Sequence, residues 1–597
     1  MIKKHLRITG IVLAFVLVCM ACPTENNSGN PDPVTSTVSV AITAQPTSRN
    51  YASGAAIVPL AVTATATDGA TLSYQWYEAS TFANTGGTAI SGATVSSYQP
   101  VVADGAKFFY VAVTGTLGGA KNTQISSPAR IQIGLDAAPT AEVTVTETQA
   151  QYVQGFGGMS NAFSIGGSTG APARYMEMRD IDTMFNPDTG LGLTFLRIMI
   201  WPYPLSEVIR GEVEPQMNNA ATYLNAVRRV NNYGGYVLAS PWTAPARFKT
   251  NDALTAGGHL RTNMYGEYAQ YLRNYASEMA SYGAPIYAIS IQNEPSLIVS
   301  YDGMEWTEEQ HRNFLRDHGN FTRNPTAVRG FGSGKATDYV RVVSGEPHQV
   351  GTWWNTAMDL VIADPNANAN LDVGAYHIYG GSGSQAAISR NGNFKKDTWM
   401  TEYNINSQNE TGYWQDSTWD FAWVFAETIH QVIAVNESNA YIWWYLKRFY
   451  GIIGDGSYGT ANGAVMPRGH VLSHYAKYAT DTVMVKASTT HPAGTTNIRL
   501  SAYQRKSNKV TPVEQRVMAN EDSISVVMYD RRTTTGDNTP LKINLPDGFT
   551  AASAFGIISS SDDNTRRAPL LVVLADDGRS AEVSMPINSI ISIKFVK

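Results

Sequence analysis

Seven short apolar segments recur between residues 193 and 448, and amphipathic stretches separate them. The segments are LTFLRIMIW (193–201), GGYVLASPW (234–242), PIYAISIQNEP (285–295), VRVVSGEP (340–347), LDVGAYHIYGG (371–381), DTWMTEYN (397–404) and NAYIWWYLKR (439–448), with TAVRGFG (326–332) as an alternative to the fourth. Between them, stretches such as NMYGEYAQYLRNYASEMASYG carry apolar residues three and four positions apart, as helices do. Strands that alternate with helices in this way predict a (β/α)8 TIM barrel.

Polar and aromatic side chains stand where these segments end. The carboxyl ends of the strands of such a barrel converge on one mouth, so one pocket is expected there. Its expected lining is Arg197, Trp242, Asn293, Glu294, His377, Tyr379, Glu402 and Trp444. Adjacent residues of a strand point to opposite sides, so only one of Trp443 and Trp444 can face the mouth.

Two of these residues, Glu294 and Glu402, form a candidate catalytic pair. They are 108 residues apart, about three strand-helix units, which places them on strands three apart and across the mouth from each other. Retaining glycoside hydrolysis needs two carboxyl groups about 5–5.5 Å apart, one as acid and base and the other as nucleophile. A single glutamate at a strand end is usually a salt-bridge partner, but the pair favours catalysis.

Composition narrows the class of ligand. The chain has a formal net charge of −5, a pI of about 6.1, 10% aromatic residues and only 16% charged residues. This excludes the basic surface that nucleic acid requires and suits a neutral ligand with flat faces. No cluster of His, Cys and Asp has zinc spacing, so His377 is expected to be a hydrogen-bonding wall residue, with no metal or cofactor.

The N-terminus has the layout of an export signal. Residues 1–22 hold three basic residues, an apolar run from Ile11 to Val18 that is short for a membrane span, and the chain's only cysteines, Cys19 and Cys22. The CMAC sequence resembles a bacterial lipobox, which implies lipidation at Cys22, with Cys19 as the other acceptor. A cleaved secretory signal and a retained anchor are the alternatives. Residues 23–37 are predicted to be a flexible tether, and the protein an exported lipoprotein at the cell surface or in the periplasm.

Two further regions show the period-two pattern of strands. Residues 38–135 resemble a bacterial immunoglobulin-like β-sandwich, with Trp76 in LSYQWYE at its core and no cysteines at the usual disulfide positions. We expect a spacer here, with glycan binding or adhesion as the alternative. Residues 481–597 are predicted to form a C-terminal β-sandwich beside a catalytic barrel at 141–480. The GFGGM motif lacks the Lys-Ser/Thr of a phosphate loop and is predicted to be a tight turn that enters the barrel.

Five motifs in order, QGFGGM, SPWTAPARFKTN, YAISIQNEP, WMTEYN and AYIWWYLKRFYG, resemble glycoside hydrolase family 30 of clan A, most closely its bacterial glucuronoxylan endo-β-1,4-xylanases. The resemblance covers residue 141 to the C-terminus. It implies a barrel whose first strands are shared with a side β-sandwich. It also implies that Glu294 is the acid/base, Glu402 the nucleophile and Asn293 the partner of the sugar 2-hydroxyl. Trp242, Trp444 and Tyr379 offer faces for sugar rings, whereas Trp443 is expected in the core.

The same resemblance implies a clamp for the glucuronic acid branch of xylan. Arg448 stands at the position of the arginine that pairs with the branch carboxylate, with Tyr450 as its hydroxyl partner. Ser407 matches the family serine that holds the branch, but Asn404 replaces the family tyrosine. A surface salt bridge is the alternative role for Arg448. The departure at Asn404 predicts weaker discrimination between decorated and bare xylan.

We therefore expect a monomeric, retaining endo-xylanase that acts on glucuronoxylan, anchored to a membrane by its lipid alone. One alternative keeps the family and mechanism on undecorated or arabinosylated xylan or on β-1,6-glucan. The other is an inactive, surface glycan-binding lipoprotein.

Overall fold

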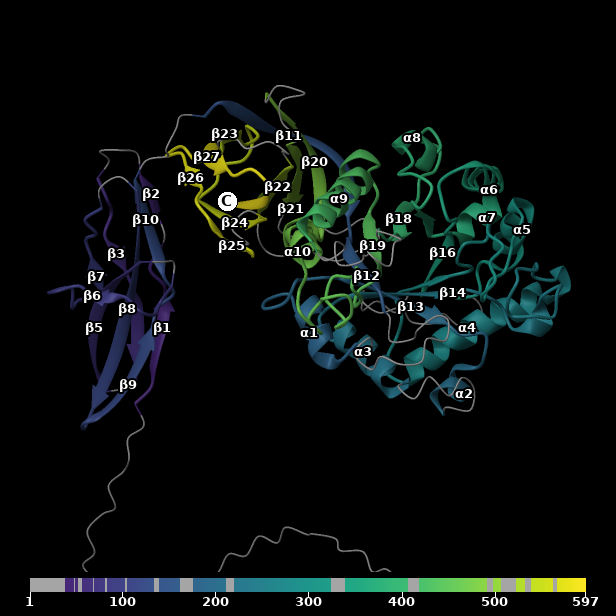
Figure 1. Cartoon of the computed structure of the whole chain (residues 1–597), viewed down its shortest axis with the longest axis horizontal. Helices are drawn as coiled ribbons and strands as arrows, with labels where there is room; N and C mark the ends of the chain where they lie inside the picture. Colours follow the sequence, from purple (N-terminus) through teal and green to yellow (C-terminus); the bar gives the residue numbers. More distant parts are fainter. Residues whose placement is uncertain are drawn as a thin grey trace, which may run out of the picture. The chain divides into compact units, whose positions relative to one another are not determined.

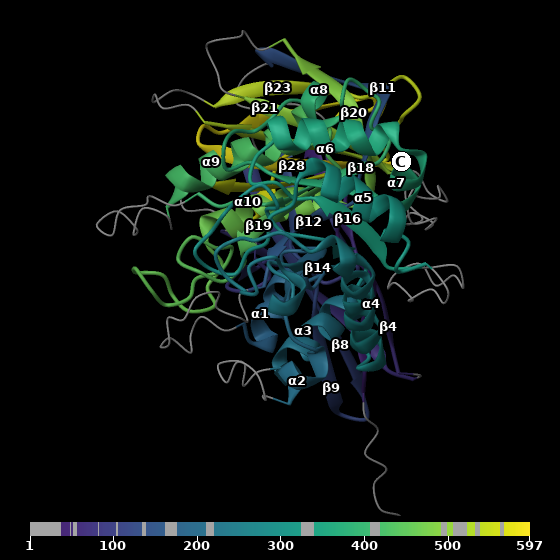
Figure 2. The ribbon, with the colours of Figure 1, turned by 90° about the vertical axis from the view of Figure 1, so that its right-hand side faces the viewer.

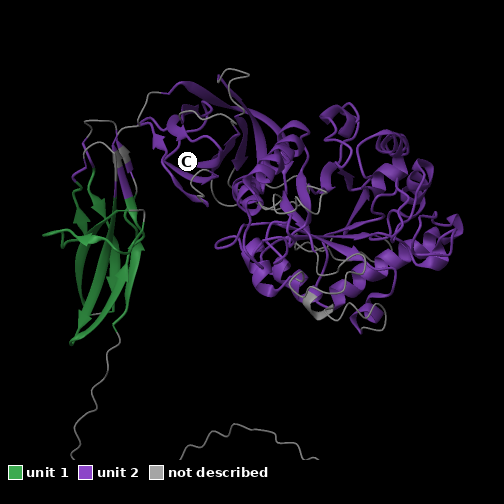
Figure 3. Cartoon of the chain, in the orientation of Figure 1, with its two compact units in different colours: residues 1–47, 58–100, 108–129 green, residues 48–57, 101–107, 130–597 purple. Residues whose placement is uncertain are grey.

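The computed structural model describes residues 38–47, 49–51, 56–67, 69–80, 83–102, 105–133, 139–160, 176–210, 220–323, 339–405, 418–490, 498–505, 522–531, 538–561 and 566–597 (Figure 1). The predicted signal peptide and tether, and with them Cys22, lie outside these residues, as does Ser407. No helix among the described residues is long and apolar enough to cross a membrane. The chain divides into two compact units (Figure 3), which are taken one at a time below.

The smaller unit is formed of strands from the region before residue 134. The strands before residue 134 pair in the orders β1-β4, β3-β7 and β2-β10-β8-β5-β6, with β9 paired to β8. The strands are β1 (Val40–Ala44), β2 (Arg49–Tyr51), β3 (Leu60–Ala61), β4 (Thr63–Ala66), β5 (Thr71–Ala79), β6 (Thr88–Ala89), β7 (Ser97–Tyr98), β8 (Gly105–Leu117), β9 (Ala120–Ile125) and β10 (Ala129–Ile133). Of these, β2, most of β10 and the start of β8 are assigned to the larger unit. Trp76 on β5 is fully buried, and its indole N–H donates to the carbonyl of Val95 at 2.9 Å.

A closed barrel of eight parallel strands is the centre of the larger unit, as predicted. Neighbours follow chain order all the way around, and β12 closes the ring on β19. The strands are β12 (Gly155–Met159), β13 (Phe195–Ile200), β14 (Tyr236–Pro241), β15 (Ala288–Ser290), β16 (Arg341–Gly345), β17 (Val373–His377), β18 (Asp397–Glu402) and β19 (Ala440–Tyr445). All seven segments singled out in the sequence became strands, and VRVVSGEP supplied the fourth of them.

The eighth strand corrects one prediction. GFGGM is not a turn at the barrel entrance but is itself the first barrel strand, β12, and it is buried throughout. Glycine is needed at position 157 because β12 runs very close to β13 there. A Cβ atom at Gly157 would lie 1.8 Å from the carbonyl oxygen of Phe195, so no other residue fits there.

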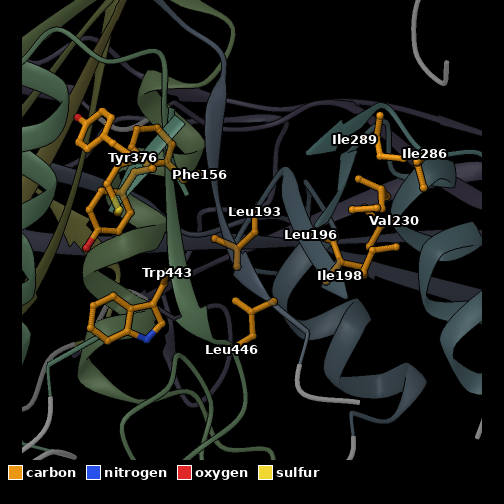
Figure 4. Close-up of a cluster of buried hydrophobic side chains, with 14 of the residues drawn as sticks. Phe156, Leu193, Leu196, Ile198, Val230, Ile286, Ile289, Tyr376, Trp443 and Leu446 are labelled. Carbon is orange, nitrogen blue, oxygen red and sulfur yellow. The ribbon is translucent and has the colours of Figure 1, made fainter. Parts of the chain in front are cut away.

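Helices surround the barrel and cover its apolar strands. They are α1 (Met178–Phe185), α2 (Leu205–Ile209), α3 (Ala220–Asn232), α4 (Tyr265–Ser281), α5 (Glu308–His318), α6 (Thr352–Ala363), α7 (Pro365–Asn370), α8 (Gln385–Ile388), α9 (Trp419–His430) and α10 (Pro467–Ala479). Two short 3₁₀ helices, η3 (Ala246–Phe248) and η4 (Thr262–Met264), and a π-helix, η6 (Gln431–Val435), accompany them. Their apolar faces meet the strands in one large buried cluster, part of which is drawn in Figure 4. Within it the rings of Trp443 and Phe425 lie 4.8 Å apart, edge to face.

Nine strands that follow the barrel and one that precedes it form a ten-stranded sheet with its own apolar core. Its order is β25 (Ala568–Leu570), β24 (Ser553–Ser560), β28 (Ser589–Val596), β22 (Ser523–Asp530), β21 (Arg499–Arg505), β20 (Thr482–Thr489), β11 (Ala141–Val153), β23 (Thr539–Asn544), β27 (Ser580–Met585) and β26 (Val573–Leu574). β11, which precedes the barrel in the chain, lies between β20 and β23 (Figure 1). Figure 2 shows the three strands grouped in the upper part of the view.

The sheet is fixed to the barrel by helix α10. His474 of this helix is fully buried, and its two ring nitrogens lie 2.8 and 3.0 Å from the hydroxyls of Ser592 and Ser559 on the sheet. The same helix also contacts the barrel strand β12. Because α10 packs on both layers, the sheet and the barrel form one compact unit.

Adjacent tryptophans on β19 give a test of this packing. Trp443 is fully buried in the barrel core, whereas Trp444 is partly exposed. We expect Trp443→Ala to lower the free energy of unfolding by about 3–5 kcal/mol, because it leaves a large cavity. Trp444→Ala, the matched control, should lower it by less. Urea unfolding followed by far-ultraviolet circular dichroism measures both losses, and equal losses would contradict the assignment of opposite sides.

Candidate active site

The two glutamates meet at the carboxyl ends of the barrel strands. Glu402 is the last residue of β18, and Glu294 follows β15, three strands away in the ring. A carboxylate oxygen of each and a ring nitrogen of His377 lie within 4.8 Å of one another. This separation fits direct attack by one carboxylate on the sugar, as in retaining hydrolysis. The larger gap of about 6.5–9.5 Å, which leaves room for a water, is typical of inversion.

Hydrogen bonds hold the backbone of Glu294 in a strained conformation. It adopts a φ of 46°, a left-handed conformation that is unfavourable for a non-glycine residue. Its amide N–H donates to the carbonyl of Glu346 at 2.9 Å, and Gln292, two residues earlier, donates its side-chain amide to the carbonyls of Trp242 and Asn293. The backbone therefore fixes where the carboxyl group points.

A single guanidinium, that of Arg197 on β13, links the polar groups of the site. Its Nη1 donates to Glu402 Oε2 at 2.6 Å, and its Nη2 donates to Asn293 Oδ1 at 2.6 Å and to Glu346 Oε1 at 3.0 Å. The ring of Trp242 lies 4.9 Å from the guanidinium carbon. Burial opposes the charge, yet Glu346 and Glu402 raise the pKa of Arg197 above its ordinary value. Because Arg197 is fully buried, it braces the carboxylates from below and offers no surface to a ligand.

Glu294 is set up as an acid. Burial raises its pKa to about 7, against the opposing effects of His348 and Arg197. Its Oε1 lies 3.1 Å from Nδ1 of His377, whose own pKa burial lowers to about 4. At neutral pH this contact is therefore a hydrogen bond between a neutral imidazole and a carboxyl group that is about half protonated, not an ion pair. The side chain of Glu294 keeps 10% of its surface exposed, enough for a ligand to reach it.

Glu402 has different partners. Burial raises its pKa too, but the Arg197 guanidinium opposes that rise and is bonded to Oε2. Tyr379 donates its hydroxyl to Oε1 at 3.0 Å, and Asn404 donates in turn to the Tyr379 oxygen at 3.4 Å. Of the two glutamates, only Glu402 is bonded to a cation, so it is the one favoured as a carboxylate.

Aromatic rings line the mouth beside the pair. The rings of Trp242 and Trp444 have centroids 5.9 Å apart, and Tyr379 stacks on His348 at 5.0 Å. Trp443 points away, into the core. Trp242 is buried, whereas Trp444 and Tyr379 are partly exposed, so the rings of these two can offer a face to a sugar.

Arg448 lies just beyond β19, where Lys447 anchors the chain. The Lys447 ammonium, fully buried, pairs with Asp180 Oδ2 at 2.6 Å. The Arg448 side chain keeps 21% of its surface exposed, and its Nε lies 3.9 Å from a buried carboxylate oxygen of Asp455. Tyr450, two residues on, is buried, and burial raises its pKa to about 12 although the Arg448 charge opposes this. The guanidinium is thus accessible, but a carboxylate already stands beside it.

In the described part of the chain, one group of side chains has donor atoms close enough to hold a metal ion: Glu294, His377 and Glu402. Two features disfavour a cation there. The Arg197 guanidinium already lies 2.6 Å from Glu402, and Glu294, with a pKa of about 7, keeps its proton in about half of the molecules at neutral pH. The arrangement suits proton transfer and nucleophilic attack better than metal binding.

The sequence analysis missed three residues of this site, Glu346, His348 and Tyr301. Glu346 and His348 follow β16, and Tyr301 is near enough for both glutamates to raise its pKa, after burial, to about 12. A signal for Glu346 was present, because GEP at the end of β16 repeats the NEP that follows β15. Glu294 and Glu346 each precede a proline, and each has a φ of 46°.

Comparison with known proteins agrees with this geometry. Residues 214–444 match the family model described as the glycosyl hydrolase family 30 TIM-barrel domain, a range that includes both glutamates. A glucuronoxylanase, XynC from Bacillus subtilis strain 168, is 28% identical over 382 residues, which are 62% of this chain and 77% of that protein.

Solved structures show the same fold. A family 30 subfamily 8 xylanase from Clostridium acetobutylicum superposes with a TM-score of 0.59 at 22% identity, covering 76% of this chain and all of that one. An endo-β-1,6-glucanase superposes with a TM-score of 0.53 at 16% identity, covering 76% of this chain and 94% of that one. The sequence match and the shared barrel together identify a glycoside hydrolase family 30 TIM-barrel domain in this chain.

Proposed function

We propose that this protein is a retaining endo-β-1,4-xylanase that cleaves glucuronoxylan by double displacement. The observation that carries the proposal is the Glu294–Glu402 pair, with oxygens within 4.8 Å and with environments that favour a protonated and an ionised partner. The substrate is supported by the glucuronoxylanase that this chain resembles and by the accessible Arg448, whose charge and that of Glu402 both act on Tyr450.

In the first step Glu402 attacks the anomeric carbon while Glu294 protonates the departing glycosidic oxygen. In the second, Glu294 takes a proton from water, and that water displaces Glu402 from the glycosyl enzyme. Tyr379 and Arg197 hold the two oxygens of Glu402 in a fixed plane for attack. Asn293 accepts from Arg197 through Oδ1, which directs its amide N–H groups toward the sugar 2-hydroxyl.

A second candidate substrate is xylan without glucuronic acid. It is favoured by Asn404, whose side chain is bonded to Tyr379, and by the carboxylate of Asp455, which competes with a branch carboxylate for Arg448. The remaining parts of the proposal come from the sequence alone. They are a lipid anchor at Cys22, export to the cell surface or periplasm, and a monomer that the N-terminal module lifts from the membrane.

The pH dependence of hydrolysis follows from Glu294. Its carboxyl must be protonated to act as an acid, and the folded-state pKa is about 7, so the acid is present below that pH and lost above it. We expect kcat/KM on xylan to fall as the pH rises, with a midpoint near pH 7. The control is a 2,4-dinitrophenyl β-xylobioside, whose leaving group needs no proton. If that substrate showed the same alkaline fall in its glycosylation step, Glu294 would not be the acid.

Variants of the pair separate the two roles. Glu294→Ala should lower kcat/KM on xylan by about 10²–10⁴-fold and spare the activated substrate far more, and added azide should give the β-xylosyl azide. Glu402→Ala should be inactive on both substrates, and azide should give the α-azide. Product configuration by proton NMR is the readout. An active Glu402→Ala enzyme would refute the proposed mechanism, and a wild type inactive on every glycan would favour a binding protein.

The clamp is tested with Arg448→Ala on two substrates. A hydrogen bond to a charged group contributes about 1.5–3 kcal/mol, so kcat/KM on glucuronoxylan should fall by about 10- to 150-fold. Activity on arabinoxylan without glucuronic acid should stay unchanged, and mass spectrometry should no longer find one glucuronic acid on each product. Equal losses on both substrates would assign Arg448 a structural role and favour the second candidate.

A further inference from the structure

Glu346 is a third buried carboxylate that the double-displacement mechanism does not use. It follows β16, it is fully buried, and it adopts the strained φ of 46°. Its Oε2 has no hydrogen-bond partner among the described residues. A strained backbone typically costs about 1–3 kcal/mol, and a buried polar atom without a partner adds to that cost. A residue kept in this state is therefore a candidate for function.

Its contacts lead to both catalytic glutamates by separate routes. Through its side chain, Oε1 accepts from Arg197 Nη2 at 3.0 Å and lies 3.5 Å from the Ser240 hydroxyl, which also accepts from Arg197 Nε at 3.3 Å. Through its backbone, the carbonyl accepts from the Glu294 N–H at 2.9 Å, and the N–H donates to the Ala375 carbonyl at 2.6 Å. Glu346 thus touches the group that braces Glu402 and the backbone that aims Glu294.

We propose that Glu346 is a positioning residue whose negative charge shares the Arg197 guanidinium with Glu402, so that the cation braces the nucleophile without ionising the acid/base Glu294. This inference rests on the function proposed above. A lone guanidinium beside two carboxyl groups would stabilise both as anions. A second carboxylate on the same cation leaves less positive field for Glu294.

The surroundings of Glu294 support this assignment. The titratable and charged groups that surround it are Arg197, Tyr301, Glu346, His348, His377, Tyr379 and Glu402. Burial is the main cause of the raised pKa of Glu294, His348 and Arg197 oppose it, and Glu346 raises it further. The lowered pKa values of His348 and His377 leave both rings largely neutral at pH 7. At pH 7 the charges that act on Glu294 are therefore mainly those of Arg197, Glu346 and Glu402.

The test is the pH profile of kcat/KM on xylan for Glu346→Gln, which keeps the shape of the side chain and removes its charge. We expect the alkaline limb to move to lower pH by about one unit, with kcat reduced more than KM is changed, because Glu346 does not touch the substrate. Ser240→Ala is the matched control. It removes an uncharged contact to the same guanidinium and should leave the limb in place.

A second pair of variants guards against misfolding. Glu346→Asp keeps the charge and Glu346→Asn removes it in a side chain of equal size, so the limb should lie at lower pH in Glu346→Asn than in Glu346→Asp. Circular dichroism checks that each variant is folded. Suppose that the wild type shows the alkaline limb and that the limb keeps the same midpoint in folded Glu346→Gln and Glu346→Asn. This inference is then overturned, and the proposed function stands. If the wild type hydrolyses no glycan, both are overturned.

Discussion

The buried charge of Arg197 is the constraint on which the rest of the site depends. A guanidinium with no exposed surface is stable only if carboxylates and hydrogen-bond acceptors surround it, and leaving such a charge unpaired typically costs about 3–5 kcal/mol. Its acceptors, Asn293, Glu346 and Glu402, lie at the ends of three different barrel strands. Satisfying one side chain therefore fixes the positions of three strand ends relative to β13, and with them the geometry of the mouth.

Two glutamates of the same chemical type differ here because of what touches them. Glu402 is bonded to a guanidinium and a tyrosine hydroxyl, whereas Glu294 meets a neutral imidazole in a mostly buried setting. Burial acts on both, and the direct cation acts on one. That difference lets one carboxyl hold a proton while its neighbour remains a nucleophile, although both side chains are glutamates.

Much of the barrel could be predicted because its information is local. Each apolar segment is short and followed by a helical pattern, and the distance from Glu294 to Glu402 gives the number of intervening strands without a structure. GFGGM was misassigned as a turn because glycine signals turns locally, and only the approach of Phe195 explains its place in a strand. Glu346 was overlooked for a related reason. In the sequence, GEP resembles the end of any strand. Only the structure shows that Arg197, on a strand three positions away in the ring, donates a hydrogen bond to Glu346.

By itself the sequence determined the repeating strand-helix units, the polar residues at their ends and the pairing of two glutamates, because hydrophobic period and spacing along the chain specify these directly. Only the tertiary structure decided which side chains are buried beneath the site and which are open to a ligand. Arg197 is the clearest case, since it was expected to line the pocket and lies fully buried below it. Burial and charge coupling depend on groups brought together from distant strands, and those distances are not encoded by any local pattern.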